Sequence, residues 1–333
     1  SAGVAFSTVE NAMIFAEISQ SNFDLFNYRN YFQGAGQKFR FRASLGVKST
    51  NLLLSFEEPW LYDREVAGGF ELFASEVKYL STLYNEARYG AEVYMRKRLF
   101  ELVEGRLYYR LEEVNINDIA SNASSYIRAS QGGHTISKVG LRLLRDTRDN
   151  LAMPTRGSRL CLLNELSGLG GNVDYYRLEA QAGKWWPTFE TLNQVFSVVG
   201  RMGTIAPYNG QTVPFYETYY LGGPNNLRGY KYRDIGPRDA AGEVIGGDTM
   251  AWFSTEYSIE VITPVRLAVF YDGGFVNASA WTLSVDKYYN DVGFGARIFI
   301  MGAPLRLDFG YPLDVDNGMK KRWNFNFSFG VVF

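Results

Sequence analysis

Side chains that commonly perform covalent catalysis or bind metals are scarce in this chain. It contains one histidine, His134, and one cysteine, Cys161. A Cys/His metal cluster therefore cannot form, and a nucleophile–His–acid triad would have to be built on His134. That residue lies in a Gln-Gly-Gly-His-Thr stretch typical of a solvated loop, and the chain has no Gly-x-Ser-x-Gly elbow and no Walker loop. The sequence predicts neither an enzyme nor a cofactor.

A set of charged residues could act together instead. Alternation of polar and apolar side chains along two neighbouring segments puts Glu256 and Asp272 on polar faces. A turn near Val261–Pro264 would make these segments antiparallel neighbours, with the two carboxylates about 10 Å apart along the strand direction. Such a pair favours a cation between them, and the planar guanidinium of Arg228 can meet carboxylates in bidentate fashion. Charges on such faces also pair in many ways, so alternation alone leaves other partners open.

The dominant pattern along the chain is this period-two alternation, in blocks of about ten residues. It is clearest in the last block, where one face consists of Trp323, Phe325, Phe327, Phe329, Val331 and Phe333. The opposite face, with Arg322, Asn324, Asn326, Ser328 and Gly330, is polar or small except at Val332, and the preceding block has Arg306, Asp308 and Gly310 on the corresponding face. A strand of a soluble sandwich can alternate in this way, but an aromatic residue at nearly every outward position is typical of a transmembrane β-barrel.

Composition agrees with a barrel. No stretch of 18 apolar residues occurs, which excludes a helical membrane protein. Aromatic residues make up 16% of the chain, which fits interfacial girdles but also occurs in aromatic-rich soluble β-sandwiches. A net charge of −1 argues against a nucleic-acid partner.

The alternation predicts an all-β fold, a transmembrane antiparallel β-barrel of about sixteen strands that forms one domain over residues 1–333. The expected strands are 3–10, 11–20, 36–48, 50–58, 66–78, 85–99, 103–116, 136–145, 156–167, 172–186, 193–205, 246–260, 264–275, 289–300, 303–313 and 322–333.

Loop lengths predict the orientation. Connections on one side are short, as periplasmic turns are, except for Ser21–Ala35 with its unusual sequence Asn-Phe-Asp-Leu-Phe-Asn-Tyr. The other side, expected to be extracellular, carries Asn117–Thr135, Val276–Tyr288 and the longest loop, Ala206–Ile245. A loop of about 40 residues in a compact fold is usually functional or disordered.

That long loop contains a Gly-Gly pair, a short spacer and a Leu-Arg-Gly-Tyr tetrad. The residues are Gly222, Gly223, Leu227, Arg228, Gly229 and Tyr230. The run resembles the sixth extracellular loop of the BamA-type outer-membrane assembly proteins. Further stretches resemble the same family in chain order: Glu57-Glu58-Pro59-Trp60, Asp146-Thr147-Arg148-Asp149-Asn150, Pro154-Thr155-Arg156-Gly157-Ser158 and Pro214-Phe215-Tyr216-Glu217.

The resemblance implies that the long loop folds into the lumen, where Arg228 meets Glu256 and Asp272. Gly229 suits close approach of the loop to the wall, because it has no side chain. The implied function is folding and insertion of β-barrel proteins into the bacterial outer membrane, without covalent chemistry. The implied partners are unfolded outer-membrane proteins, lipoproteins of the assembly complex and the lipid bilayer.

The resemblance also implies a lateral seam between the first and last strands, Gly3–Glu10 and Arg322–Phe333. Its expected residues are Val4, Phe6, Phe325, Phe327, Phe329, Gly330 and Phe333. An opened seam would expose two strand edges that can template an incoming strand. A C-terminal aromatic residue is equally the ordinary assembly signal of any outer-membrane barrel.

Two other functions stay open. A two-partner-secretion barrel or a TamA-like translocation component would share the barrel and the loop tetrad. A passive porin would have the barrel without the tetrad. The basic clusters Arg96-Lys97-Arg98 and Lys320-Lys321-Arg322 are expected to be interfacial anchors. Family members carry periplasmic POTRA domains before the barrel, and because strands begin almost at Ser1, we expect this chain to be the barrel part alone, after removal of any signal peptide.

Overall fold

The structure is a computed structural model, and it describes residues 2–78, 80–189, 193–240, 242–300, 303–316 and 319–329. These residues form sixteen β-strands, the short helix α1 (Ser125–Ala129) and two 3-10 turns, η1 (Tyr28–Asn30) and η2 (Leu61–Asp63). The first eight strands are β1 (Ala2–Ser7), β2 (Asn11–Phe23), β3 (Gln37–Gly46), β4 (Ser49–Glu58), β5 (Ala67–Val77), β6 (Asn85–Phe100), β7 (Val103–Asn117) and β8 (Gly132–Asp146). The remaining eight are β9 (Gly157–Ser167), β10 (Tyr175–Pro187), β11 (Val195–Pro207), β12 (Thr249–Ile262), β13 (Val265–Asn277), β14 (Tyr289–Ile300), β15 (Ala303–Pro312) and β16 (Asn324–Phe329).

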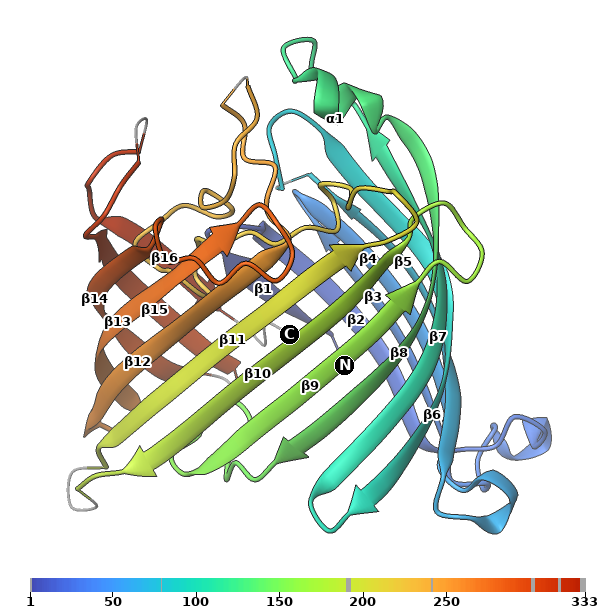
Figure 1. The fold of residues 1–333 in the computed structure, drawn as a ribbon. Helices are drawn as coiled ribbons and strands as arrows, with labels where there is room; N and C mark the ends of the chain where they lie inside the picture. Colours follow the sequence, from blue (N-terminus) through green and yellow to red (C-terminus); the bar gives the residue numbers. More distant parts are fainter. Residues whose placement is uncertain are drawn as a thin grey trace. The chain divides into compact units, whose positions relative to one another are not determined.

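The strands pair in chain order, and β1 pairs with β16, so the sheet is a closed antiparallel barrel (Figure 1). Closure matters in a bilayer, because an open edge would leave backbone N–H and C=O groups without partners. The prediction of an all-β barrel with about sixteen strands is confirmed. No helix within the described ranges is long and apolar enough to cross a membrane.

Strand boundaries agree with the expected ones to within a few residues. The eighth strand begins at Gly132 and not at residue 136, and the second continues to Phe23. Helix α1 lies in the loop before β8, where no helix was predicted, and Ser124 caps it by accepting a hydrogen bond of 3.3 Å from the backbone N–H of Ile127. Its five residues are too few to produce a helical period in the sequence.

Contacts between Cα atoms divide the chain into two compact units. The first comprises residues 1–4, 10–144 and 163–174, and the second comprises residues 5–9, 145–162 and 175–333. The two are described separately below.

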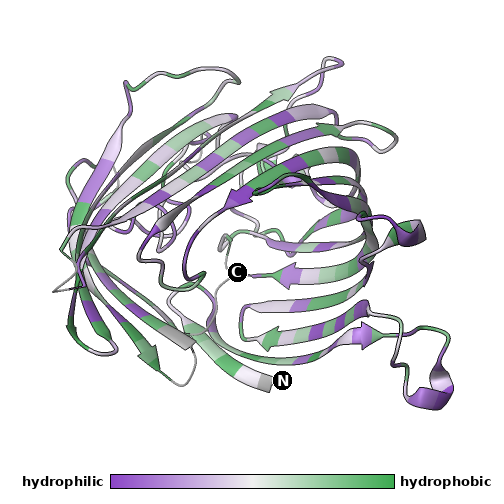
Figure 2. Cartoon of the chain, turned by 90° about the horizontal axis from the view of Figure 1, so that it is seen from below, coloured by the Kyte–Doolittle hydropathy of each residue, from purple (hydrophilic) through white to green (hydrophobic). Residues whose placement is uncertain are grey.

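Along the strands of the first unit, hydrophilic and hydrophobic residues alternate (Figure 2), and many apolar side chains there are exposed whereas several carboxylates are buried. On β6, for example, Val93 is 54% exposed whereas its neighbour Glu92 is 2% exposed. Ion pairs join the buried carboxylates to arginines on adjacent strands, such as Arg110 with Glu92 at 2.6 Å. Arg96 also points inward, 2.6 Å from Glu57, so the expectation that it anchors the barrel at the interface was wrong. The lumen face thus uses charge pairs where a soluble protein has an apolar core.

Candidate functional site

The second unit brings the predicted acidic pair together on β12 and β13. In the register of these strands Asp272 lies opposite Ser254, two residues from Glu256 along the strand. The carboxylates are therefore about 7 Å apart in the strand direction, at about 3.3 Å per residue. The separation is shorter than the expected value of about 10 Å because the hairpin closes with Ile262 opposite Val265 instead of Val261 opposite Pro264, and the register shift between Glu260 and Ile262 offsets only part of this difference.

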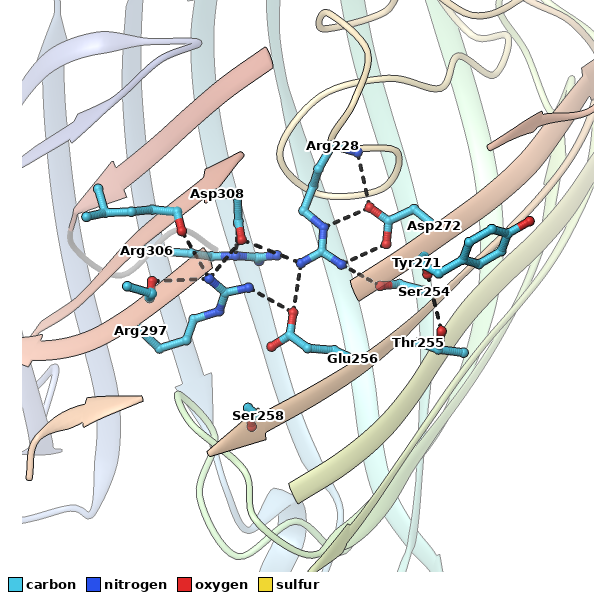
Figure 3. Close-up of polar contacts among 12 residues, drawn as sticks. Arg228, Ser254, Thr255, Glu256, Ser258, Tyr271, Asp272, Arg297, Arg306 and Asp308 are labelled. Atoms are coloured by element: carbon cyan, nitrogen blue, oxygen red, sulfur yellow. Dashed lines mark hydrogen bonds and ion pairs between the residues drawn. The ribbon is translucent and has the colours of Figure 1, made fainter. Parts of the chain in front are cut away.

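Arg228 descends from the long loop to these carboxylates (Figure 3). Its Nε lies 2.7 Å from Asp272 Oδ2 and its Nη2 lies 2.7 Å from Asp272 Oδ1, which is a bidentate pair. Its Nη1 donates to Glu256 Oε2 at 2.7 Å, and Nη2 also donates to Ser254 Oγ at 2.8 Å. The guanidinium carbon lies 3.4 Å from the ring centroid of Phe270, and Arg228 is 2% exposed. The buried guanidinium is therefore stabilised by two carboxylates, by hydrogen bonds and by the face of an aromatic ring.

Three further charged residues extend this cluster. Arg297 lies 2.8 Å from both Glu256 and Asp308, and Arg306 lies 2.8 Å from Asp308 (Figure 3). Buried charges are costly unless they are paired, and here each guanidinium has a carboxylate within reach. The sequence put Arg306 and Asp308 on a polar face, but it gave no register from which their pairing could be predicted.

Asp291 is the exception in this cluster. It lies directly opposite Asp272 on β14, and it is fully buried. Among the described residues no cation forms an ion pair with Asp291. Two carboxyl groups thus face each other, and of these two only Asp272 forms a described ion pair, with Arg228.

The backbone of the tetrad lies against the wall at two glycines. A Cβ on Gly229 would lie 2.5 Å from the Cβ of Asp291, and a Cβ on Gly310 would lie 2.6 Å from the carbonyl carbon of Arg228. Both separations are closer than van der Waals contact allows. Gly229 was predicted to permit close approach of the loop, whereas Gly310 on β15 was not recognised.

The last strand holds the same loop segment through two amides. Asn326 Nδ2 donates to the Arg228 carbonyl oxygen at 2.8 Å, and Asn324 Nδ2 lies 2.9 Å from that oxygen and 3.0 Å from the Tyr230 carbonyl oxygen. Both asparagines were predicted to lie on the polar face of the last strand. The groups that they bind are backbone carbonyl oxygens. Every residue has such an oxygen, so the sequence could not indicate this contact.

The other predicted residues of the motif shape the loop itself. Gly222 and Gly223 have positive φ values of 103° and 109°, which a residue with a side chain rarely adopts. Leu227 is fully buried, and its carbonyl oxygen accepts a hydrogen bond of 3.0 Å from the N–H of Gly223. The Tyr230 hydroxyl lies 2.9 Å from the carbonyl oxygen of Asn290, at the start of β14.

A second attachment of the loop lies on β10, and the sequence did not predict it. The carboxylate of Glu217 accepts hydrogen bonds of 2.8 Å from the hydroxyl of Tyr175 and from Arg177 Nη2. Two residues later, the Tyr219 hydroxyl donates to Glu179 at 2.8 Å. The loop is therefore bound to the wall at two separate places.

The seam between β1 and β16 is short in the described part of the chain. Two residue pairs join these strands, Phe6 with Phe329 and Ser7 with Ser328, whereas six pairs join β15 to β16. Val4 and Phe325 are 49% and 44% exposed, as outward positions are. The predicted seam residues Gly330 and Phe333 lie outside the described residues, and Phe327 is half-buried within β16.

Comparison with known proteins decides the family. The family model of the Omp85 superfamily domain matches residues 31–333. The chain belongs to the Omp85 superfamily.

A relative within the superfamily is the outer membrane protein assembly factor BamA of Nitratidesulfovibrio vulgaris, 30% identical over 317 residues. The match covers 92% of this chain and 39% of that relative, so this chain spans less than half of its length. The fold matches BamA from Haemophilus ducreyi lacking POTRA domains 1–3, with a TM-score of 0.83 at 20% identity over 98% of this chain and 68% of the other. CdiB from Acinetobacter baumannii gives a TM-score of 0.62 at 15% identity, covering 98% and 58%. The resemblance to BamA-type proteins is confirmed, and the chain is a protein of the bacterial outer membrane.

The turns that carried the superfamily resemblance have their own hydrogen-bond networks. After β8, Arg148 Nη2 donates to Asp146 at 2.6 Å, and the carboxylate of Asp149 accepts from the backbone N–H groups of Thr155 at 2.9 Å and Arg156 at 3.2 Å. Burial raises the pKa of Asp149, but hydrogen bonds from Thr155 and its neighbours outweigh burial and lower it to about 2. These motif residues fix the turn.

Proposed function

We propose that this chain is the barrel of an outer-membrane protein assembly factor, which promotes folding and insertion of other β-barrel proteins. The relative from Nitratidesulfovibrio vulgaris carries that function in its name. The observation that best supports the proposal is the anchored tetrad, in which Arg228 contacts Asp272 and Glu256 while its carbonyl oxygen accepts from Asn326.

The proposed working part is the β1–β16 seam. A strand edge carries free N–H and C=O groups, and an incoming segment can pair with them by β-augmentation. In the described part of the seam two residue pairs and one further backbone hydrogen bond, from Thr8 N–H to the Phe327 carbonyl oxygen, join β1 to β16, against six pairs between β15 and β16. The anchored loop would hold β16 in position while β1 moves away from it.

The partners are proposed with the function. Unfolded barrel proteins would enter as substrates, and lipoproteins of an assembly complex would assist. The chain spans 39% of its Nitratidesulfovibrio vulgaris relative, and we propose that upstream POTRA domains in the full-length protein receive these partners.

A translocation barrel of the same superfamily is the main rival function. The likeness to CdiB supports the shared fold alone. The Glu57–Trp60 turn and the Asp146–Asn150 turn resemble those of assembly proteins, and they favour insertion. A passive porin would have the barrel without the tetrad, so a tetrad anchored through the buried Arg228 argues against one.

Reconstitution tests the proposed function. The full-length protein, placed in liposomes with accessory lipoproteins supplied, should increase the folding rate of an unrelated barrel protein over that in empty liposomes. An unchanged rate contradicts assembly. A large and steady ion-selective conductance without any acceleration would favour a channel.

A further inference from the structure

The connection between β2 and β3 exposes a cluster of apolar side chains. Its exposed residues are Leu25 at 50%, Phe26 at 84%, Tyr28 at 67%, Tyr31 at 86% and Phe32 at 43%. The next turn at this end of the same unit, between β4 and β5, adds Trp60 at 57% and Tyr62 at 92%. We call these seven residues the aromatic platform. Large apolar side chains gathered on a surface indicate an interaction site, because water disfavours them there.

The platform has a defined backbone. Phe32 N–H donates to the Asn27 carbonyl oxygen at 2.9 Å, and Asn27 Nδ2 donates to the Gln33 carbonyl oxygen at 3.0 Å. Tyr31 and Phe32 adopt left-handed conformations with φ values of 52° and 58°. Such conformations are unfavourable for bulky aromatic residues, so the local hydrogen bonds maintain a geometry that displays these rings.

The platform continues an aromatic row on the outer face of the wall. Phe32 stacks on Phe23 with ring centroids 5.8 Å apart, and Phe23 stacks on Phe39 at 5.2 Å. Phe56 follows on β4, 6.2 Å from Phe23, and Phe70 follows on β5, 5.7 Å from Phe56. Aromatic rows of this kind lie at the boundary between hydrocarbon and headgroups in outer-membrane barrels. The platform therefore begins at the depth of the headgroups.

Both turns project outward from the wall of their unit. Figure 1 shows the blue connections before β3 and β5 extending sideways at the lower end of the strands, and Figure 2 shows the same two projections from below. An outward projection at headgroup depth meets lipid rather than the lumen.

The residue types of the platform favour contact with a lipid interface. Tyrosine and tryptophan combine an apolar body with a polar tip, which suits the boundary between headgroups and acyl chains. Between β2 and β3 the charged residues are one aspartate, Asp24, and one arginine, Arg29, so this segment has no net charge. The turn between β4 and β5 carries Asp63, Arg64 and Glu65, a net charge of −1. Neither turn has an excess of positive charge, so attraction to anionic lipids does not hold the platform in place.

We propose that the aromatic platform inserts into the headgroup region of the leaflet at this end of the barrel and anchors β2–β5 at a fixed depth. The anchor is independent of the assembly function. It depends on burial of apolar side chains, and it requires no particular headgroup charge.

Site-specific quenching tests the proposal. In the full-length protein with Cys161→Ser, Phe26→Cys or Tyr31→Cys is labelled with a fluorophore and reconstituted in phosphatidylcholine vesicles. Quenching is measured with nitroxide-bearing lipids and with aqueous iodide. Ile18→Cys on the outer face of β2, where the native side chain is 66% exposed, is the lipid control, and Lys287→Cys in the β13–β14 loop is the aqueous control. The heat-dependent gel mobility of each variant verifies that it is folded.

We expect the labels at positions 26 and 31 to be quenched by lipid nitroxide and shielded from iodide, as at position 18, with equal quenching when phosphatidylglycerol is added. Labels that behave like position 287 overturn the proposal. Shielding that arises only in native membranes, without lipid quenching in vesicles, would assign the platform to a protein partner and also overturn it.

Discussion

The side-chain amide of Asn326 donates a hydrogen bond of 2.8 Å to the backbone carbonyl oxygen of Arg228. The guanidinium of the same arginine is held by Asp272 on β13 and by Glu256 on β12. One loop residue thus links the last strand of the barrel to two strands remote from it in the sheet order. Movement of β16 relative to β12 and β13 therefore has to break contacts of Arg228.

The amide link predicts the effect of changing the last strand. Asn326→Ala leaves the Arg228 carbonyl oxygen with one amide donor, the side chain of Asn324. The double variant Asn324→Ala/Asn326→Ala removes both amide donors. Loss of a buried hydrogen-bond partner costs about 1–3 kcal/mol. We expect protease to cut the long loop faster in the double variant, with Asn115→Ala as a control on β7. Equal cleavage rates would show that the amides do not hold the loop.

The buried arginine predicts energetic coupling. Arg228→Ala leaves Asp272 without its cation and Glu256 with Arg297 alone, and breaking a buried ion pair costs about 3–5 kcal/mol. Arg228→Lys should restore only part of this loss, because lysine cannot form the bidentate pair. A double-mutant cycle of Arg228→Ala with Glu256→Gln, measured by urea unfolding, should give a clear coupling energy. Additive effects of the two substitutions contradict the pairing.

We expect a substitution of Asp291 to stabilise the barrel. The carboxyl group of this residue faces Asp272 in a buried position, and no described cation pairs with it. Asp291→Asn replaces a carboxyl group that faces a second carboxyl group by a neutral group of the same shape, so at alkaline pH, where both carboxyl groups would ionise, we expect the free energy of unfolding to rise by about 1–3 kcal/mol. The same change at its neighbour, Asp272→Asn, should lower that free energy. Destabilisation by both substitutions would mean that the Asp291 charge is compensated.

Asp248, at the end of the long loop before β12, predicts a pH dependence. Burial raises its pKa from 3.8 to about 6. The folded state therefore disfavours ionisation, and stability is lost as the pH rises from 3.8 to about 6. Asp248→Asn should increase the free energy of unfolding at pH 8 and change it little at pH 3.5. An effect of equal size at both pH values would contradict burial as the cause.

The strands were predictable because lipid and lumen impose opposite polarities on alternating positions. That alternation also put Arg306, Asp308, Asn324 and Asn326 on the polar side of their strands. Which residues pair across neighbouring strands was harder to predict from the sequence, because the pairing depends on the strand register. The shift between Glu260 and Ile262 changes which residue Asp272 faces, and no residue type in the sequence marks that shift.

The path of the long loop could be predicted only where the family motif marks it. Arg228 was assigned to the lumen from the resemblance together with the acidic pair. The attachment of Glu217 to Tyr175 and Arg177 was missed, because an irregular loop has no period that fixes the direction of its side chains. Gly310 was missed because its role is to leave space for the Arg228 backbone, which only the folded structure reveals.

The most direct test of the central claim is a reversible lock on the seam. In the full-length protein with Cys161→Ser, Ser7→Cys and Ser328→Cys place two thiols at paired positions of β1 and β16. A control pair, Ala296→Cys with Leu307→Cys, locks β14 to β15. We predict that oxidation of the seam pair stops acceleration of barrel folding in liposomes and that a reductant restores it, while the control pair stays active in both states. Undiminished acceleration with a fully oxidised seam would contradict the account.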